Sequence, residues 1–149
     1  MEIERKYLIK ELPDNIQTYA FHIIEQGYLC TDPVIRIRRQ DDEYILTYKS
    51  KGFLAREEVN LPLTQSAYNQ LKDKVDGIII QKKRYLIPFE NNLTIELDQF
   101  EAPYENLLLA EVEFCSIEDA NAFVPPIWFQ DDVTMLTTYQ NSSLSKGLV

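Results

Sequence analysis

Residues that commonly act as nucleophiles or soft metal ligands are scarce in this sequence of 149 residues. It has one histidine, His22, and two cysteines, Cys30 and Cys115. The cysteines lie far apart and lack the spacing of a metal site, so we expect them to be reduced and without a catalytic role. A single histidine with no evident partner is more often structural, so we assign no site to His22.

Long apolar runs and an excess of positive charge are also absent. No run approaches the roughly 20 residues of a membrane span, so we expect no membrane partner. The N-terminus carries charge from its second residue and has no apolar signal region, so we expect no secretory leader and, by default, a cytoplasmic location. The net charge of −9 argues against general affinity for nucleic acid. A local basic cluster can still bind an anion inside an acidic protein.

The remaining composition is ordinary for a globular protein, with 45% hydrophobic and 26% charged residues. The length suits one domain with a sizeable core. Because the chain contains no low-complexity linker, internal repeat or composition boundary, we expect residues 1–149 to form a single domain.

Alternating apolar and polar residues, rich in β-branched and aromatic types, predict a mainly β protein of the α+β class. Eight strands are expected, near residues 2–9, 21–30, 34–41, 43–50, 55–61, 78–87, 93–100 and 106–115. Thr64 is a candidate N-cap for a helix that reaches about Asp76. Ser116 begins a sequence like a capping box, which predicts a helix over 116–124. Short helical turns are expected near 13–17 and 142–146.

The predicted strands carry ions on one face. In the first strand, Glu2, Glu4 and Lys6 share a face because strand side chains alternate with period two. Repeating this assignment along the chain gives equal numbers of acids and bases. The seven acids are Glu2, Glu4, Glu58, Glu96, Asp98, Glu111 and Glu113, and the seven bases are Lys6, Arg36, Arg38, Lys49, Arg56, Lys82 and Arg84.

Two structures would account for these faces. An antiparallel sheet with one solvated face is common, and it would explain any single strand. Across seven strands, regular pairs of arginines and carboxylates favour a sheet that curls on itself with its charges inward. The helices at 64–76 and 116–124 would then cover the apolar faces from outside. Closure would also remove exposed strand edges. We therefore predict a closed eight-stranded antiparallel barrel, a tunnel with a charged lumen.

A lumen of both signs suits a highly charged anion that is bound together with cations. Arginine and lysine bind phosphate oxygens, and arginine can do so bidentately. Carboxylates bind hard cations such as Mg²⁺ or Mn²⁺ through oxygen. Triphosphate with a divalent metal fits both sets of side chains.

The strand motifs resemble those of the CYTH superfamily, also called the triphosphate tunnel metalloenzymes, over nearly the whole chain. The first motif matches the signature E-x-E-x-K of that family, and the others follow in the family's order. In chain order the motifs are Glu2-Ile3-Glu4-Arg5-Lys6, Gln26-Gly27-Tyr28-Leu29, Arg36-Ile37-Arg38, Leu46-Thr47-Tyr48-Lys49, Arg56-Glu57-Glu58, Lys82-Lys83-Arg84-Tyr85, Glu96-Leu97-Asp98-Gln99-Phe100 and Leu109-Ala110-Glu111-Val112-Glu113-Phe114. The segment Val133-Thr134 to Leu144 is similar to the ending of compact bacterial members.

This resemblance implies roles for the charged residues. Metal ligands would be Glu2, Glu4, Glu111 and Glu113, with Asp98. Phosphates would be bound by Lys6, Arg36, Arg38, Lys49, Lys82 and Arg84. The candidate catalytic residues are Lys6, Arg56 and Glu58, of which Arg56 and Glu58 would support the substrate or orient water. Asn60 departs from the pattern, because compact bacterial members often have a second glutamate there. That departure bears on metal preference and rate.

The leading function is hydrolysis of inorganic tripolyphosphate with Mg²⁺ or Mn²⁺. Because no Ser, Cys or His is an obvious covalent nucleophile, direct attack by water is the simpler scheme. The resemblance leaves open class IV adenylate cyclase activity and hydrolysis of ATP or thiamine triphosphate. A binder of polyphosphate or nucleotide without catalysis is an alternative of another class. The expected partner is a small triphosphate, and the oligomeric state is open, with a homodimer as one option.

Overall fold

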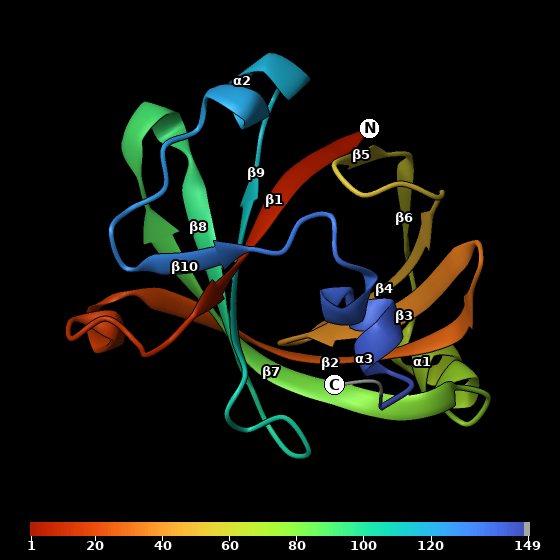
Figure 1. Cartoon of the computed structure of the whole chain (residues 1–149). Helices are drawn as coiled ribbons and strands as arrows, with labels where there is room; N and C mark the ends of the chain where they lie inside the picture. Colours follow the sequence, from red (N-terminus) through yellow and green to blue (C-terminus); the bar gives the residue numbers. More distant parts are fainter. Residues whose placement is uncertain (148–149) are drawn as a thin grey trace.

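The computed structural model describes residues 1–147, and Figure 1 shows that strands dominate it. All eight predicted strands are present. The strands are β1 (Glu2–Ile9), β2 (Ala20–Thr31), β3 (Val34–Gln40), β4 (Glu43–Lys49), β5 (Ala55–Arg56), β6 (Glu58–Pro62), β7 (Asp76–Pro88), β8 (Thr94–Phe100), β9 (Leu108–Glu113) and β10 (Phe129–Asp132).

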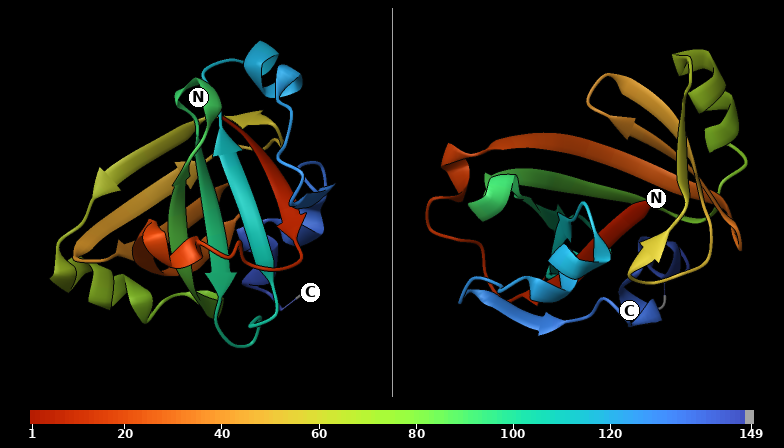
Figure 2. Two further views of the ribbon diagram at one scale, coloured as in Figure 1. Left: turned by 90° about the vertical axis from the view of Figure 1, so that its left-hand side faces the viewer. Right: turned by 90° about the horizontal axis from the view of Figure 1, so that it is seen from above.

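The strands form one antiparallel sheet that curls into a nearly closed barrel (Figure 2). Nine strands follow the order β10-β1-β9-β8-β7-β2-β3-β4-β6, and β5 pairs with β1. Because β5 continues into β6, the pairs Glu2–Arg56 and Ile3–Ala55 join the two ends of the sheet. The predicted antiparallel tunnel is therefore confirmed, and its closing seam is short.

Two details differ from the expectation. The strand predicted at 55–61 is divided at Glu57, where the chain turns from pairing with β1 to pairing with β4. β10 was not predicted, because its sequence, Phe-Gln-Asp-Asp, lacks β-branched residues. It pairs with the second half of β1, beyond the stretch that β5 occupies.

The helices begin at the predicted caps. The Thr64 side chain accepts a hydrogen bond from the Ala67 amide at the start of α1 (Gln65–Lys72). The Ser116 side chain accepts one from the Asp119 amide at the start of α2 (Ile117–Ala122). α1 ends before the predicted Asp76, because that residue already begins β7. The predicted turns correspond to a 3₁₀ helix, η1 (Ile16–Thr18), and to α3 (Asn141–Leu144).

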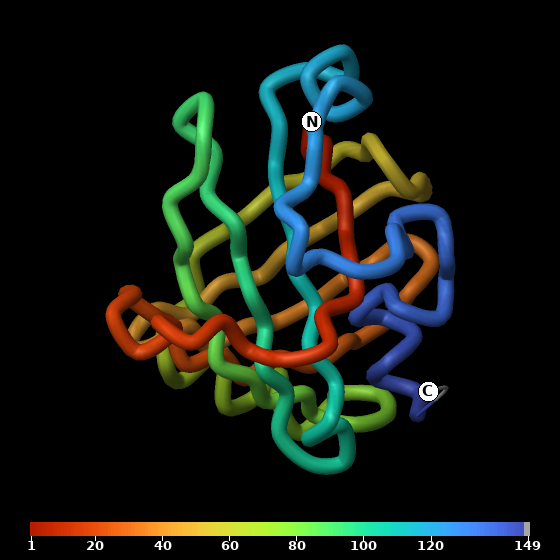
Figure 3. The backbone as a smooth tube through the Cα atoms, turned by 60° about the vertical axis from the view of Figure 1, so that its left-hand side comes forward, coloured from red at the N-terminus to blue at the C-terminus, as the bar shows by residue number. Residues whose placement is uncertain are grey.

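Two further 3₁₀ turns complete the elements, η2 (Glu90–Asn92) and η3 (Thr137–Tyr139). The η2 turn and α2 extend at the same end of the barrel (Figure 3). Among residues 1–147, no helix is both long and apolar enough to cross a membrane.

Two apolar clusters lie on opposite sides of the barrel wall. Tyr7, Ile95, Leu97 and Val112 are buried on the outer side of β1, β8 and β9, where they form one cluster with Ala120 of α2. Because strand residues alternate, burying these residues outward turns the charged faces inward. A second cluster lies on the inner faces, where Tyr28 lines the cavity and belongs to the same cluster as Leu144 of α3.

Candidate functional site

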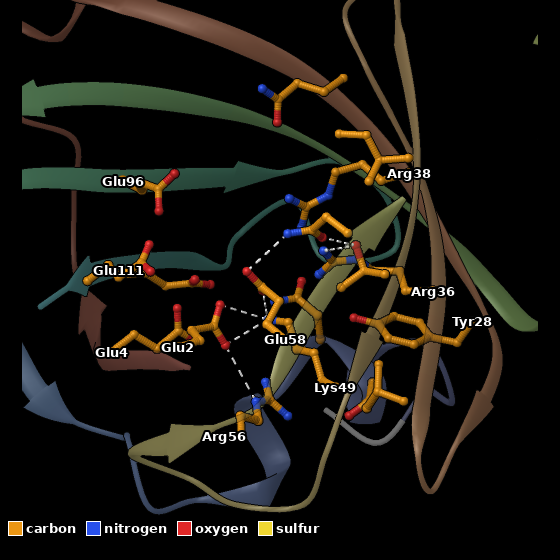
Figure 4. Close-up of a pocket in the computed structure, with 18 of the residues that line it drawn as sticks. Glu2, Glu4, Tyr28, Arg36, Arg38, Lys49, Arg56, Glu58, Glu96 and Glu111 are labelled. Carbon is orange, nitrogen blue, oxygen red and sulfur yellow. Dashed lines mark hydrogen bonds and ion pairs between the residues drawn. The ribbon is translucent and has the colours of Figure 1, made fainter. Parts of the chain in front are cut away.

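A cavity of about 280 Å³ lies inside the barrel (Figure 4). Twelve of the fourteen predicted lumen residues line it, namely Glu2, Glu4, Lys6, Arg36, Arg38, Lys49, Arg56, Glu58, Arg84, Glu96, Glu111 and Glu113. The remaining two, Lys82 and Asp98, are buried in the wall. The sequence pattern therefore predicted which strand faces line the tunnel.

Strand register brings like charges together on one side of the cavity. Glu4 of β1 is directly opposite Glu113 of β9, and Glu96 of β8 is directly opposite Glu111. In Figure 4, Glu2, Glu4, Glu96 and Glu111 lie on the side away from Arg36 and Arg38. Like charges directly opposite one another destabilise a sheet. The register therefore concentrates negative charge on this side of the cavity.

Among the described residues, Glu4 is a carboxylate of the cavity without a positive partner. Within residues 1–147, its carboxylate oxygens make no hydrogen bond and no ion pair, in contrast to those of Glu2 and Glu111. Burial, together with the charges of Glu111 and Glu2, raises its pKa to about 8. A bound cation would favour the ionised carboxylate and so lower this pKa.

Glu2 is paired with bases at the closing seam. The Lys49 Nζ donates to both Glu2 oxygens at 2.9 and 3.0 Å, and the Arg56 Nε lies 3.5 Å from Glu2 Oε1. Lys49 also lies 3.3 Å from Glu58 Oε2. Burial is the main cause that raises the pKa of Glu2. The predicted catalytic residues Arg56 and Glu58 thus share this cluster with a predicted metal ligand.

Glu111 has two bases nearby, Lys6 at 3.6 Å and Arg84 at 3.7 Å. Burial opposes its ionisation, but Lys6, Arg84 and Lys82 outweigh this effect and hold the pKa of Glu111 well below its usual value. Glu113 is exposed and makes no ion pair among the residues described. Burial and the charges of Glu2, Glu58 and Glu96 raise its pKa.

The opposite side of the cavity holds two arginines that have no carboxylate partner in the described part of the chain. Arg36 donates to the Thr47 hydroxyl at 3.2 Å, and its buried Nε has no partner there. Arg38 donates from Nε to Gln26 Oε1 at 2.8 Å. Burial, with Arg36 and Arg84 nearby, lowers the pKa of Arg38 to about 9. These unneutralised guanidinium groups suit an anion.

Lys82 and Asp98 are placed differently from the other predicted site residues. Their side chains are both 0% exposed and form an ion pair at 2.7 Å. Asp98 also accepts two hydrogen bonds from Arg84, at 2.7 and 2.9 Å. Burial lowers the pKa of Lys82 to about 7, although Asp98 acts in the other direction. Both oxygens of Asp98 are thus occupied by bases of the wall.

Several polar residues of the site were not assigned a role from the sequence. Thr47 and Asn60 are hydrogen-bonded at 2.6 Å, and Asn60 donates to Glu58 Oε1 at 3.2 Å. Their positions on the charged faces of β4 and β6 were the available signal. Asn141 and Ser142 of α3 also line the cavity. Alternation gives no signal for them, because tertiary folding brings α3 to the barrel, and the resemblance of the segment that ends at Leu144 was the available signal.

The residues present fit a hard divalent cation. In residues 1–147 no three Asp, Glu, His or Cys side chains are already arranged around one position. The cavity nevertheless contains several carboxylate groups, and carboxylate oxygens are ligands that Mg²⁺ and Mn²⁺ prefer. Glu4 supports this fit, because it is half-buried, lies opposite Glu113 and has no positive partner among the described residues.

Comparison with known proteins agrees with this geometry. The CYTH domain family profile matches residues 1–125. An inorganic triphosphatase of Nitrosomonas europaea is 37% identical over 150 residues, covering 99% of this chain and 98% of that protein. The crystal structure of the inorganic triphosphatase NE1496 superposes with a TM-score of 0.71 at 34% identity, covering 97% of this chain and 94% of that one.

A more distant structure has the same fold. HpAC1 from Hippeastrum, assigned as an adenylyl cyclase and described as having a dominant triphosphatase activity, has a TM-score of 0.58 at 17% identity. The alignment covers 81% of this chain and 83% of that one, and it speaks to the fold alone. The profile match and the Nitrosomonas relative go further, and they confirm the resemblance of the strand motifs: this chain belongs to the CYTH domain family.

Proposed function

We propose that this chain hydrolyses a small inorganic triphosphate, tripolyphosphate being the leading substrate, to pyrophosphate and phosphate. The observation that carries this proposal is the coexistence of unpaired charges of both signs in one cavity. Arg36 and Arg38 lack carboxylate partners among the described residues, and Glu4 lacks a base. The similarity to an inorganic triphosphatase over 99% of the chain supports the same substrate class.

The proposed reaction is direct attack by water on a terminal phosphorus. The water oxygen forms a bond to phosphorus, the bond to the bridging oxygen breaks, and pyrophosphate leaves. One proton of the water stays on the new phosphate, and the other passes to the pyrophosphate or to solvent. CYTH triphosphatases are in general metal-dependent. Bound Mg²⁺ or Mn²⁺ would polarise phosphate oxygens and acidify water. We propose Glu2, Glu4, Glu111 and Glu113 as its ligands. The prediction that Asp98 also binds metal requires it to leave Lys82 or Arg84.

The bases then bind and orient the anion. Arg36, Arg38 and Lys49 face the cavity from β3 and β4, and Lys6 and Arg84 face it from the other wall. These groups would stabilise the negative charge of the transferred phosphoryl group. Lys82 would act from the wall, through its contact with Asp98. We propose that Arg56 and Glu58 orient the substrate or the attacking water beside Glu2.

Phosphate release from tripolyphosphate with Mg²⁺ or Mn²⁺ tests this function. We expect turnover with at least one metal and its loss in Glu4→Gln and Lys6→Ala. Glu57→Gln is the matched control, because Glu57 is exposed and does not line the cavity. No release with either metal, or full activity in both site variants, would exclude the proposal. Binding without turnover would instead support a non-catalytic polyphosphate binder.

Product analysis with ATP separates the enzymatic alternatives. Formation of ADP and phosphate would indicate nucleotide hydrolysis, whereas cyclic AMP and pyrophosphate would indicate cyclase activity. A comparison with thiamine triphosphate completes the substrate series. We further propose that residues 1–149 act as one tunnel domain with a small triphosphate as partner. The cytoplasmic location, the absence of nucleic-acid binding and the homodimer option stay predictions.

A further inference from the structure

Gln26 lies directly opposite Arg38 in the pairing of β2 with β3. Its side chain is completely buried, at 0% exposed. Gln26 Oε1 accepts a hydrogen bond from Arg38 Nε at 2.8 Å, and Gln26 Nε2 donates to Asn141 Oδ1 at 3.2 Å. Both ends of the amide are therefore used, and the contact with Asn141 fixes which end faces Arg38.

Arg84 differs from Arg38 in the charge of its hydrogen-bond partners. Arg84 contacts three carboxylates, Asp98, Glu96 and Glu111, at distances from 2.7 to 3.7 Å. Arg38 faces the same cavity, but its hydrogen-bond partner is a neutral amide. A neutral acceptor fixes the direction of the guanidinium group without cancelling its charge. A carboxylate at the same place would form a stronger contact and would compete with an anion for the arginine.

We propose that Gln26 is a positioning residue, which orients Arg38 through a neutral hydrogen bond and leaves the arginine's charge available to the triphosphate. This inference rests on the proposed function for the identity of the anion. Asn141 extends the arrangement, because its Oδ1 accepts from both Gln26 and Lys82, at 3.2 and 3.3 Å. Gln26 and Asn141 thus connect Arg38 of β3 to Lys82 of β7 by hydrogen bonds, and neither of the two is charged.

The decisive variant is Gln26→Glu, which keeps the size and the acceptor, adds one negative charge and places an oxygen where Gln26 donates to Asn141. We expect the KM for tripolyphosphate to rise about tenfold, which corresponds to about 1.4 kcal/mol, with kcat within about twofold. The thermal midpoint should change little, because the new ion pair with Arg38 offsets the lost hydrogen bond to Asn141. A purely structural glutamine predicts the opposite pattern, with a change in stability and unchanged affinity.

Gln99→Glu is the matched control. It adds the same charge on β8, at a position opposite Lys83 and outside the cavity. We expect its KM to equal that of the unchanged protein. Gln26→Met is the second variant, because it keeps the volume but removes the acceptor, and it should raise KM by allowing Arg38 to move. It also decides the inference if Gln26→Glu does not fold.

Calorimetric titration with tripolyphosphate in the absence of metal separates the inference from the proposed function. If the unchanged protein binds but shows no turnover, the hydrolase proposal fails, and about tenfold weaker binding by Gln26→Glu still supports the role of Gln26. Equal binding by the unchanged protein, Gln26→Glu and Gln26→Met overturns the inference. Lack of any binding by the unchanged protein overturns it as well.

Discussion

At the scale of single residues, the site depends on charges that the fold does not neutralise. Most ions of the tunnel have a partner of opposite charge, such as Lys49 with Glu2 or Arg84 with Asp98. Glu4 and Arg38 do not have one among the residues described, and each departs from its ordinary pKa, upward to about 8 and downward to about 9. In both cases burial is the largest cause, because it disfavours the charged form.

The pH dependence of stability should reveal Glu4. Its pKa is about 8 in the folded protein and about 4.5 when unfolded, so the folded state binds more protons between these values. Stability should therefore fall as the pH rises through this window. In Glu4→Gln the fall should be smaller. Urea unfolding in EDTA at a series of pH values measures this, with Glu57→Gln as control. Parallel curves for the unchanged protein and Glu4→Gln would contradict the expectation.

Asn60 offers a test of metal affinity. Its amide accepts from Thr47 and donates to Glu58, so it holds two polar groups without adding charge. In Asn60→Glu an additional carboxylate would face the cavity, and we expect half-maximal activity at roughly tenfold less metal. Without metal, the variant should be less stable because Glu58 is adjacent. Asn60→Gln should show neither effect. An unchanged metal titration in Asn60→Glu would show that the residue at position 60 does not influence metal affinity.

At the scale of elements, the two faces of β1 have different roles: one lines the tunnel and the other packs against the outer elements. Lys6 faces the tunnel, whereas Arg5 faces outward, toward α2 and β10. Arg5 donates to Ala120 O at 2.9 Å and to Asp132 Oδ2 at 2.7 Å, so it joins β1 to α2 and β10. The family signature thus contains a residue whose contacts are structural.

Arg5→Ala should therefore lower stability and leave the chemistry intact. We expect a loss of about 1–3 kcal/mol in the free energy of unfolding, because two hydrogen bonds and the packing of the guanidinium on Tyr7 are removed. The kcat of the folded variant should be unchanged. Chemical unfolding and phosphate release measure the two effects. A stable but inactive variant would mean that Arg5 contributes to the site.

Gly27 tests the contact between β2 and the segment that follows α1. A Cβ at this position would lie 2.7 Å from Val75 Cγ1 and Cγ2 and 2.9 Å from Ile79 Cδ1. Gly27→Ala should cost about 1–3 kcal/mol, because neighbouring groups must move. Adding Val75→Ala should recover part of that loss, and a double-mutant cycle measures the coupling. Additive effects would show that the close approach is not the cause.

The sequence predicted most elements and strand faces because period two alone fixes which residues share a side. Three features depend on tertiary contacts and were beyond this pattern. β10 forms only against β1. Asn141 reaches the cavity through the packing of α3. The burial of Lys82 with Asp98 follows from the register of β7 and β8, which places Arg84 opposite Asp98. Alternation cannot supply such partners.

At the scale of the whole molecule, the charge is divided unequally between the inside and the outside. The seven acids and seven bases assigned to the inner strand faces cancel, so the net charge of −9 resides on the remaining residues. An anionic substrate must therefore approach a negative exterior before it reaches Arg36 and Arg38. Such a field acts over about 10 Å at 0.1 M salt.

Ionic strength should consequently increase the rate of substrate capture. Between about 10 and about 100 mM salt, at fixed free metal, we expect kcat/KM for tripolyphosphate to rise as repulsion is screened. The value of kcat should change less, because it does not depend on the association of substrate with the enzyme. Steady-state kinetics at several salt concentrations measure both. A steady fall of kcat/KM would show that attraction by the tunnel dominates over the exterior.

The carboxylates that face one another across β1, β9 and β8 also bear on how this protein responds to selection for heat resistance. Glu4 and Glu113 are such a pair, and each has a raised pKa, so a neutral residue at either position would relieve repulsion. A screen that rewards survival at high temperature alone would favour glutamine at these positions. The variants that withstand heating best would then be those that have lost two of the proposed metal ligands.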